Sequence, residues 1–209
     1  MNFLDRLICE FDRGLRTIAA SAHAERTSPA AEIPQNHSVS AKDRLEAARL
    51  MRVNHCGEVC AQALYQGQAL VAQDESSREV FQQAAREERD HLAWCQQRLD
   101  ELGGRPSVLN PLWYAGSFTL GVASGLFGDK WGMTFLVETE GQVERHLDDH
   151  LARMPQSDVK SRRVLEVMRE DEIRHGKSGK EHGANAMPFA IKLAMRASSR
   201  LMTQTAYWV

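Results

Sequence analysis

Apolar residues recur at intervals of three and four along most of this chain, a spacing that places them on one face of an α-helix. The pattern predicts helices over residues 40–72, 76–102, 129–153, 157–183 and 187–206. Ser40 and Asp43 resemble a capping box at the start of the first helix, and Gly103, Gly104 and Pro106 would end the second. Because no segment alternates apolar and polar residues as a strand does, the sequence predicts an all-α fold.

The N-terminal region has a different pattern. Charged residues interrupt its apolar series, which predicts an amphipathic helix instead of a secretory signal, and therefore a protein that is not exported. The series consists of Phe3, Leu4, Leu7, Ile8, Phe11, Leu15 and Ile18. Residues 21–40 contain two prolines and no apolar period, as linkers do. We expect two parts, an N-terminal helix with its linker over residues 1–40 and a helical domain over residues 41–209.

The longest uncharged stretch, residues 106–128, is a poor candidate for a membrane span. Prolines interrupt its start, and its continuous part comprises the 16 residues 112–127. At about 1.5 Å per residue this part would form about 24 Å of helix, whereas a bilayer core is about 30 Å thick. We expect no transmembrane helix.

The composition narrows the classes of protein to which the chain could belong. A length of 209 residues with 43% hydrophobic and 26% charged residues suits one domain with a filled core. The net charge of −2, without basic or acidic blocks, argues against binding to nucleic acid. Four cysteines without a CxxC pair predict free thiols and a reducing compartment.

Two Glu-x-x-His motifs carry the candidate chemistry, because a carboxylate and an imidazole three residues apart share one face of a helix. A single glutamate precedes the first motif by 30 residues and the second by 32. This repeat matches the four-helix di-iron template, in which two helices each give one glutamate and two give Glu-x-x-His. The six residues are Glu58, Glu88 and His91 in the first half, and Glu140, Glu172 and His175 in the second.

These carboxylates lie in apolar stripes, as Glu140 does between Leu136 and Val143. A buried carboxylate without a partner costs several kcal/mol, whereas a whole domain is stable by only about 5–15 kcal/mol. Two divalent cations would balance four glutamates and leave the histidines as neutral ligands, and mixed carboxylate and imidazole donors favour iron. The alternative is a set of solvated helix faces with surface ion pairs to Arg89 and Arg174.

Two further acids compete with Glu140. Glu138 is rotated from it by about 200° on a helix, so it should face elsewhere. Glu144 lies on nearly the same face and could be a shifting carboxylate or an acid outside the ligand shell. Glu140 fits the repeat best.

Nearby histidines and cysteines leave several alternatives open. His55 lies three residues before Glu58, and we expect it to donate or accept a hydrogen bond outside the ligand shell rather than to bind metal. His146 could be such an outer partner, a proton carrier or a surface residue. Cys56 and Cys60 could suggest zinc, but two thiols without further ligands are more often core residues.

At these residues the sequence resembles a known family, the demethoxyubiquinone hydroxylases, which are ferritin-like di-iron monooxygenases of ubiquinone biosynthesis. The resemblance covers residues 40–209 and rests on residues 52–58 (RVNHCGE), Glu88 with His91, residues 137–140 (VETE) with His146, and residues 170–176 (EDEIRHG). It implies a ferritin-like four-helix bundle with additional apolar and amphipathic helices. Carried over by position, the iron ligands of the family are Glu58, Glu88, His91, Glu140, Glu172 and His175. Cys56 and Cys60 stand where small residues are more familiar, which raises a question about how the first bundle helix packs.

The resemblance also implies a reaction. A reduced pair of iron ions would use O₂ to hydroxylate the ring of 5-methoxy-2-methyl-3-polyprenyl-benzoquinol (demethoxyubiquinol), giving demethylubiquinol and water. Electrons would come from an external donor, for which the family suggests NADH, and Arg49 and Arg52 are a weak candidate contact for an anionic reductant. Two alternatives remain, a ferroxidase or iron-handling protein of the ferritin type and a structural bundle without metal.

A lipid-tailed substrate requires access from a membrane. The predicted helix over residues 187–206 carries Lys192, Arg196 and Arg200 on one side, which suits a helix lying on anionic lipid, although packing against the bundle explains the pattern equally well. We expect a peripheral protein on the cytoplasmic side of the cell membrane. A homo-oligomer and a larger biosynthetic complex both stay open.

Overall fold

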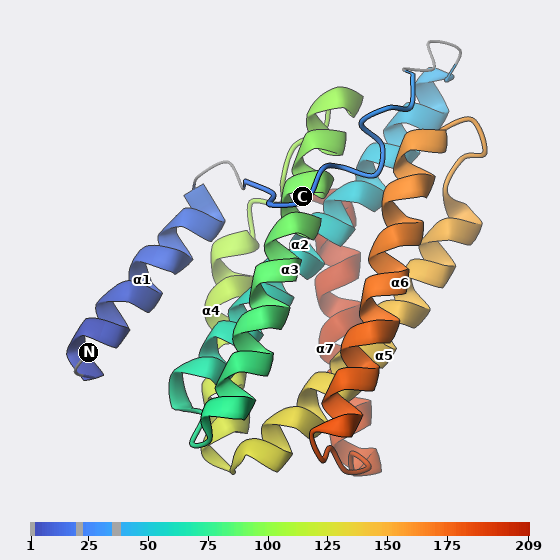
Figure 1. Ribbon diagram of the computed structural model, residues 1–209. Coiled ribbons are helices and arrows are strands. Elements are labelled where there is room, and N and C mark those ends of the chain that lie inside the picture. The colour runs from blue at the N-terminus through green and yellow to red at the C-terminus, as the bar shows by residue number, and fades with distance from the viewer. Residues whose placement is uncertain (1–2, 20–22, 35–38) are drawn as a thin grey trace.

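The computed structural model describes residues 3–19, 23–34 and 39–209, and within them the chain forms helices and no strand (Figure 1). The all-α prediction is therefore confirmed. Residues 21–22 and 35–38 of the predicted linker, and the side chains of Phe3, Leu4 and Leu7, lie outside the described part. The helices are α1 (Phe3–Ala19), α2 (Ala41–Val71), α3 (Glu75–Leu102), α4 (Asn110–Leu126), α5 (Asp129–Arg153), α6 (Val159–Glu181) and α7 (Phe189–Trp208).

Two helical hairpins form a four-helix bundle. Short connections join α2 to α3 and α5 to α6, so each pair is antiparallel, and α4 is the crossover that links the pairs (Figure 1). Ser40 caps α2 by accepting a hydrogen bond from the backbone N–H of Asp43, as predicted. Gly103 ends α3 in the left-handed conformation, with φ of 73°, which glycine adopts without a steric penalty. Observed and predicted helix ends differ by only a few residues.

The uncharged stretch forms α4, which lies directly against α2. Glycines allow this close approach. A methyl group at Gly121 would collide with the backbone carbonyl of Leu64, and one at Gly67 would lie 2.5 Å from the carbonyl oxygen of Phe118. Over the residues described, every helix lacks either the length or the apolar character needed to cross a bilayer.

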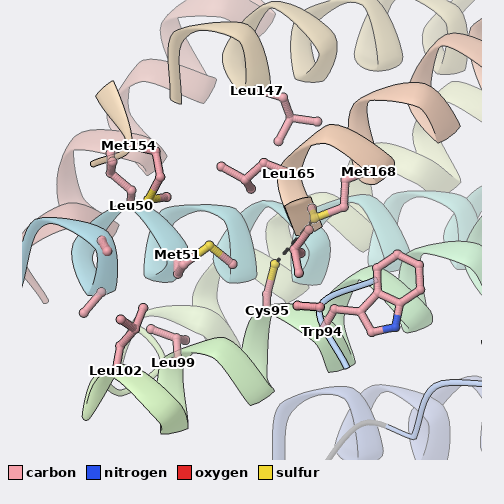
Figure 2. Packing of buried hydrophobic residues seen from close by; sticks show 14 residues of the cluster. Leu50, Met51, Trp94, Cys95, Leu99, Leu102, Leu147, Met154, Leu165 and Met168 are labelled. Carbon is pink, nitrogen blue, oxygen red and sulfur yellow. Dashed lines mark hydrogen bonds between the residues drawn. The ribbon is translucent and has the colours of Figure 1, made fainter. Parts of the chain in front are cut away.

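The bundle core consists of two apolar clusters, one toward each end. The first joins the start of α2, the end of α3, the end of α5 and the start of α6 (Figure 2). Its largest members include Leu50, Trp94, Leu99, Leu147 and Leu165. The second includes Tyr65, Phe81, Met133 and Leu136. On all four helices the residues between these clusters are those of the predicted metal site.

Two N-terminal segments lie outside the bundle. Helix α1 contacts α2 and α4 at the outer edge of the molecule (Figure 1). Residues 23–34, which we call the strap, contain no helix or strand and lie against the bundle, with Ala30 buried in the first cluster. The division of the chain at residue 40 stays a prediction.

Helix α7 covers part of α2. Ala206 packs against Val53 and Cys56, so the Cys56 thiol fills space between these two helices. Lys192 forms an ion pair with Glu138 of α5, with 3.0 Å between Nζ and Oε2. The basic stripe therefore serves partly in packing, while Arg196 and Arg200 stay exposed.

Candidate metal centre

The structure brings all six predicted ligands together in the middle of the bundle. Helices α2 and α5 each contribute one glutamate, and α3 and α6 each contribute a Glu-x-x-His motif. The side chains form two overlapping groups whose ligand atoms lie within 4.8 Å of one another. The first group is Glu58, Glu88, His91 and Glu172, and the second is Glu88, Glu140, Glu172 and His175.

Glu88 and Glu172 belong to both groups, and each faces the two imidazoles with different oxygens. Glu88 lies 3.0 Å from Nδ1 of His91 through Oε2 and 3.5 Å from Nδ1 of His175 through Oε1. Glu172 lies 3.3 Å from His91 through Oε1 and 3.7 Å from His175 through Oε2. Each of these two carboxylates could therefore contribute an oxygen to both ligand groups. Glu58 and Glu140 each approach one imidazole, at 3.6 Å in both cases.

The centre is buried and rich in negative charge. The four glutamates are at most 3% exposed. Several buried atoms here have no hydrogen-bond partner among the described residues: Oε1 of Glu88, Oε2 of Glu140, both carboxylate oxygens of Glu172 and Nδ1 of His175. Buried polar atoms are almost always paired, so these atoms are the ones available to bind a metal ion. Oxygen and imidazole donors around a space shared by four carboxylates fit divalent cations.

The imidazoles and carboxylates of the centre shift one another's pKa values. Burial alone would lower the pKa values of His91 and His175, but hydrogen bonds to the surrounding carboxylates raise both well above the ordinary value. Burial raises the pKa values of Glu58 and Glu140. Since metal ions bind carboxylates and neutral imidazoles, loading this centre must release protons.

Two outer carboxylates, which our sequence analysis missed, hold the imidazoles. Asp171 accepts a hydrogen bond of 2.9 Å from Nε2 of His91, and Glu87 accepts one of 2.9 Å from Nε2 of His175. Arg174 bridges the two acids, at 2.7 Å from Glu87 and 2.8 Å from Asp171. The available signal was an acid directly before each motif glutamate. Because each acid binds the histidine of the other motif, only the packing of α3 beside α6 identifies its partner.

Arg174 therefore does form ion pairs, as the solvated-face alternative supposed, but with acids that touch the centre. Arg89 pairs with Glu25 on the surface. Neither arginine neutralises the six residues directly, so the alternative of solvated helix faces is wrong for the four glutamates, which are buried.

The competing acids lie elsewhere. Glu138 faces away from the centre, where it binds Lys192 and accepts a hydrogen bond of 3.0 Å from Gln142. Glu144 is half-buried and belongs to neither candidate ligand group of the described residues. Neither acid therefore replaces Glu140 as the candidate ligand on α5.

The two extra histidines are buried or half-buried rather than surface residues. The side-chain amide of Asn110 donates a 3.3 Å hydrogen bond to Nδ1 of His55, which ties α2 to the start of α4 instead of supporting a metal ligand. Burial lowers the pKa of His55 to about 4. The ring of His146 lies against that of His150, with centroids 3.8 Å apart and the planes tilted by 54°, and burial lowers the pKa of His146 to about 4 as well.

The cysteines take no part in the centre. All four are free thiols, and neither Cys56 nor Cys60 belongs to a candidate metal group within the described ranges. Cys56 is buried and Cys60 half-buried, in keeping with core residues.

An apolar cavity of about 160 Å³ reaches the centre between α2, α4, α5 and α7. Glu58 and His146 form part of its wall. Most of the remaining wall is apolar and includes Leu64, Trp113, Leu120, Phe135, Val143 and Met202. A cavity of about 410 Å³, bounded by α3, α5 and α6 and lined mostly by charged and polar residues, adjoins the centre at Glu87 and His175. We call it the polar cavity. A larger cavity of about 510 Å³ between α1, α2 and α3 is lined by none of the six residues.

Comparison with known proteins agrees with this geometry. A family model described as ubiquinone biosynthesis protein COQ7 matches residues 45–206. A 3-demethoxyubiquinol 3-hydroxylase of Nitrosomonas europaea is 54% identical over 206 residues, which cover 99% of both chains. A protein of the same name from Chromobacterium violaceum is also 54% identical, over 99% of this chain and 100% of its own. The fold, the two paired motifs and these matches agree, and the chain belongs to the COQ7 family of ubiquinone biosynthesis proteins.

Proposed function

We propose that this chain is a di-iron monooxygenase that hydroxylates the ring of 3-demethoxyubiquinol, the reaction for which its relatives are named. One observation carries the proposal: two ligand groups that share Glu88 and Glu172 lie beside an apolar cavity whose wall includes Glu58. Two metal ions held by shared carboxylates beside an apolar space would be suited to oxidising a water-insoluble molecule.

Iron is the metal we propose for both positions. Glu58 and His91 would hold one ion, Glu140 and His175 the other, and Glu88 and Glu172 would bridge them. The donors are hard oxygens and imidazole nitrogens without thiolate, a set that suits iron. When bound and reduced, iron supplies the activation of O₂, from which one oxygen atom enters the quinol ring and the other leaves as water with two electrons and two protons.

The chain itself would bind the ring and keep the site dry. A cavity of about 150 Å³ is enough for benzene, so the 160 Å³ cavity beside Glu58 is of the size of one unsubstituted aromatic ring, and the ring substituents would extend toward its opening. The two apolar clusters pack the bundle on either side of the centre, which would disfavour water along the bundle axis. No side chain is required as a covalent nucleophile.

The electron donor in this proposal lies outside the chain, and NADH is our candidate. Arg49 and Arg52, which the sequence offered as its contact, have other partners. Arg49 stacks on Trp208 at 4.6 Å, and Arg52 donates hydrogen bonds to the backbone carbonyls of Arg105 and Tyr207. Both arginines thus hold the end of α7 against α2, and a contact between them and the reductant stays a prediction.

A peripheral position on the cytoplasmic side of the cell membrane completes the proposal. Exposed apolar side chains gather on the helices around the cavity, including Leu112, Leu120 and Leu126 on α4 and Phe189, Leu193 and Leu201 on α7. A polyprenyl tail leaving the cavity between α4 and α7 would meet this surface. Single exposed apolar residues are common, so the support comes from their position on the two helices that frame the cavity.

Lipid analysis tests this function. A strain that lacks the protein should accumulate the demethoxy precursor and lose ubiquinone, the wild-type gene should restore it, and Glu172→Ala should not. A ferroxidase would instead disturb iron balance and leave the quinone pattern normal. A normal quinone profile in the deletion strain, with no second hydroxylase present, would reject the proposal.

A further inference from the structure

We propose that the strap, residues 23–34, belongs to the metal centre: Arg26 acts through Asp171 to hold His91 in the orientation and tautomer that bind metal. The inference rests on the proposed assignment of His91 as a metal ligand. It makes Arg26 a positioning residue on a segment that the sequence analysis treated as a linker.

Several contacts attach the strap to the bundle at this point. The backbone N–H of Glu25 donates a 2.6 Å hydrogen bond to Oδ1 of Asp90, and Nε of Arg26 lies 2.8 Å from Oδ2 of the same carboxylate. The Arg26 guanidinium also stacks on Trp94, with Cζ 4.8 Å from the ring centroid. The indole of Trp94 in turn donates a 3.3 Å hydrogen bond to the Arg26 carbonyl, where the strap passes beside this ring (Figure 2).

The second arm of the same guanidinium reaches toward the metal centre. Nη1 of Arg26 lies 2.8 Å from Oδ2 of Asp171, and this oxygen also accepts the hydrogen bond from Nε2 of His91. A carboxylate can only accept, so Nε2 must carry a proton, and Nδ1 faces the carboxylates of the centre, where a metal ion would bind. Asp171 is 3% exposed, so its rotamer depends on these few partners.

Among the described residues, the strap reaches the centre through Asp171, on the side of His91. Glu87, the counterpart of Asp171 on the His175 side, binds Arg174 and Gln83, whereas Asp171 binds Arg174 and Arg26. A loss of Arg26 should therefore weaken one metal position more than the other. A general loss of the strap's structure would instead be expected to weaken both metal positions alike.

The test measures iron release. The protein is loaded anaerobically with Fe(II), and the transfer of iron to an excess of chelator is followed. We expect Arg26→Met to release one of its two irons about ten-fold or more faster than the wild type, because outer partners of metal ligands typically change affinity by about 10- to 100-fold. Arg26→Lys keeps the charge but cannot bind two carboxylates as a planar fork. Its rate of iron release should therefore lie between those of the wild type and Arg26→Met. Glu25→Gln is the matched control. It removes another ion pair of the strap, the exposed one between Glu25 and Arg89 of α3, and leaves Arg26 in place.

A second comparison separates positioning from loss of structure. If Arg26 acts through Asp171, the double variant Arg26→Met with Asp171→Asn should release iron no faster than Asp171→Asn alone. Three results would overturn the inference while leaving the proposed hydroxylase intact: additive effects of the two substitutions on the rate of iron release, equal acceleration of both irons, or an unchanged rate in Arg26→Met. A wild-type chain that binds no iron would instead overturn the proposed function, and this inference with it.

Discussion

The hydroxyl of Tyr65 on α2 donates a hydrogen bond of 2.5 Å to Oε1 of Glu140 on α5. Both side chains are at most 1% exposed, and Oε2 of Glu140 has no hydrogen-bond partner among the described residues. The phenol thus fixes one oxygen of this carboxylate and leaves the other for a metal ion. Nothing in the sequence around Tyr65 singled it out, because its distance from Glu140 depends on how α2 packs beside α5.

Tyr65→Phe should weaken iron binding and destabilise the protein. Removing the hydroxyl leaves a buried carboxylate oxygen without its donor, a change that costs about 1–3 kcal/mol. Urea unfolding of the metal-free chain measures the loss of stability, and titration with Fe(II) measures the affinity. Tyr114→Phe is the control, because Tyr114 donates an equally short hydrogen bond, 2.5 Å, to Gln66, away from the centre. It should lose stability and keep its iron affinity; the same loss of affinity in both variants would contradict a specific role for Tyr65.

Glu172→Ala and Glu140→Ala should sharply lower the iron content below two ions per chain, whereas Glu138→Ala should keep it. Glu172 and Glu140 face the shared space, while Glu138 pairs with Lys192 on the other side of α5. Metal analysis after anaerobic loading with Fe(II) gives the stoichiometry. An equal loss of iron from Glu138→Ala would mean that the inward face of α5 is assigned wrongly.

Gly121→Ala should destabilise the protein by about 1–3 kcal/mol, the usual cost of forcing extra volume into a packed contact. The added methyl group would collide with the backbone of α2 at Leu64, and backbone cannot move aside as a flexible side chain can. Gly116→Ala on the same helix meets nothing within 4 Å and should raise stability slightly, because alanine favours helix over glycine. Urea denaturation compares the two variants, and equal midpoints would show that α4 does not depend on this close approach.

Reversing Arg196 and Arg200 to glutamate should weaken binding to vesicles that contain anionic lipid. Each basic residue near such a surface contributes about 1 kcal/mol, so the double variant should lose about 2 kcal/mol from attraction alone. We leave Lys192 unchanged, because its ion pair with Glu138 ties α7 to α5. A charge-matched control, Arg163→Glu with Lys177→Glu, alters exposed residues of α6 away from the cavity. Equal binding by both double variants in a sedimentation assay would mean that α7 is not the lipid-facing helix.

Local spacing was sufficient to predict the six candidate ligands. A glutamate and a histidine three residues apart share a helix face whatever the helix packs against, and the repeat at 30 and 32 residues selected the two single glutamates. The outer shell could not be found this way, because Asp171 and Glu87 bind histidines of the opposite helix. Spacing within one helix says nothing about such pairs.

The other features that the sequence did not predict also depend on contacts between different helices or segments. The sequence marks residues 106–128 only as an uncharged stretch too short to span a membrane, whereas α4 owes its place to glycines that fit the backbone of α2. Lys192 belonged to a basic stripe that suited lipid, yet its partner Glu138 lies 54 positions earlier on another helix. The strap resembled a linker because its contacts with Asp90 and Asp171 come from single polar atoms and leave no periodic pattern.

The cavity beside Glu58 also breaks the near two-fold symmetry of the ligand set. The two hairpins offer almost equivalent donors, but the half with Glu58 and His91 borders a wall of apolar side chains, while the half with Glu140 and His175 borders the polar cavity at Glu87. Metal ions bound in these halves would be chemically inequivalent neighbours, one beside an apolar wall and one beside charged and polar side chains. A hydrophobic reactant and the protons that its oxidation consumes could then arrive from opposite sides of the bundle without sharing a route.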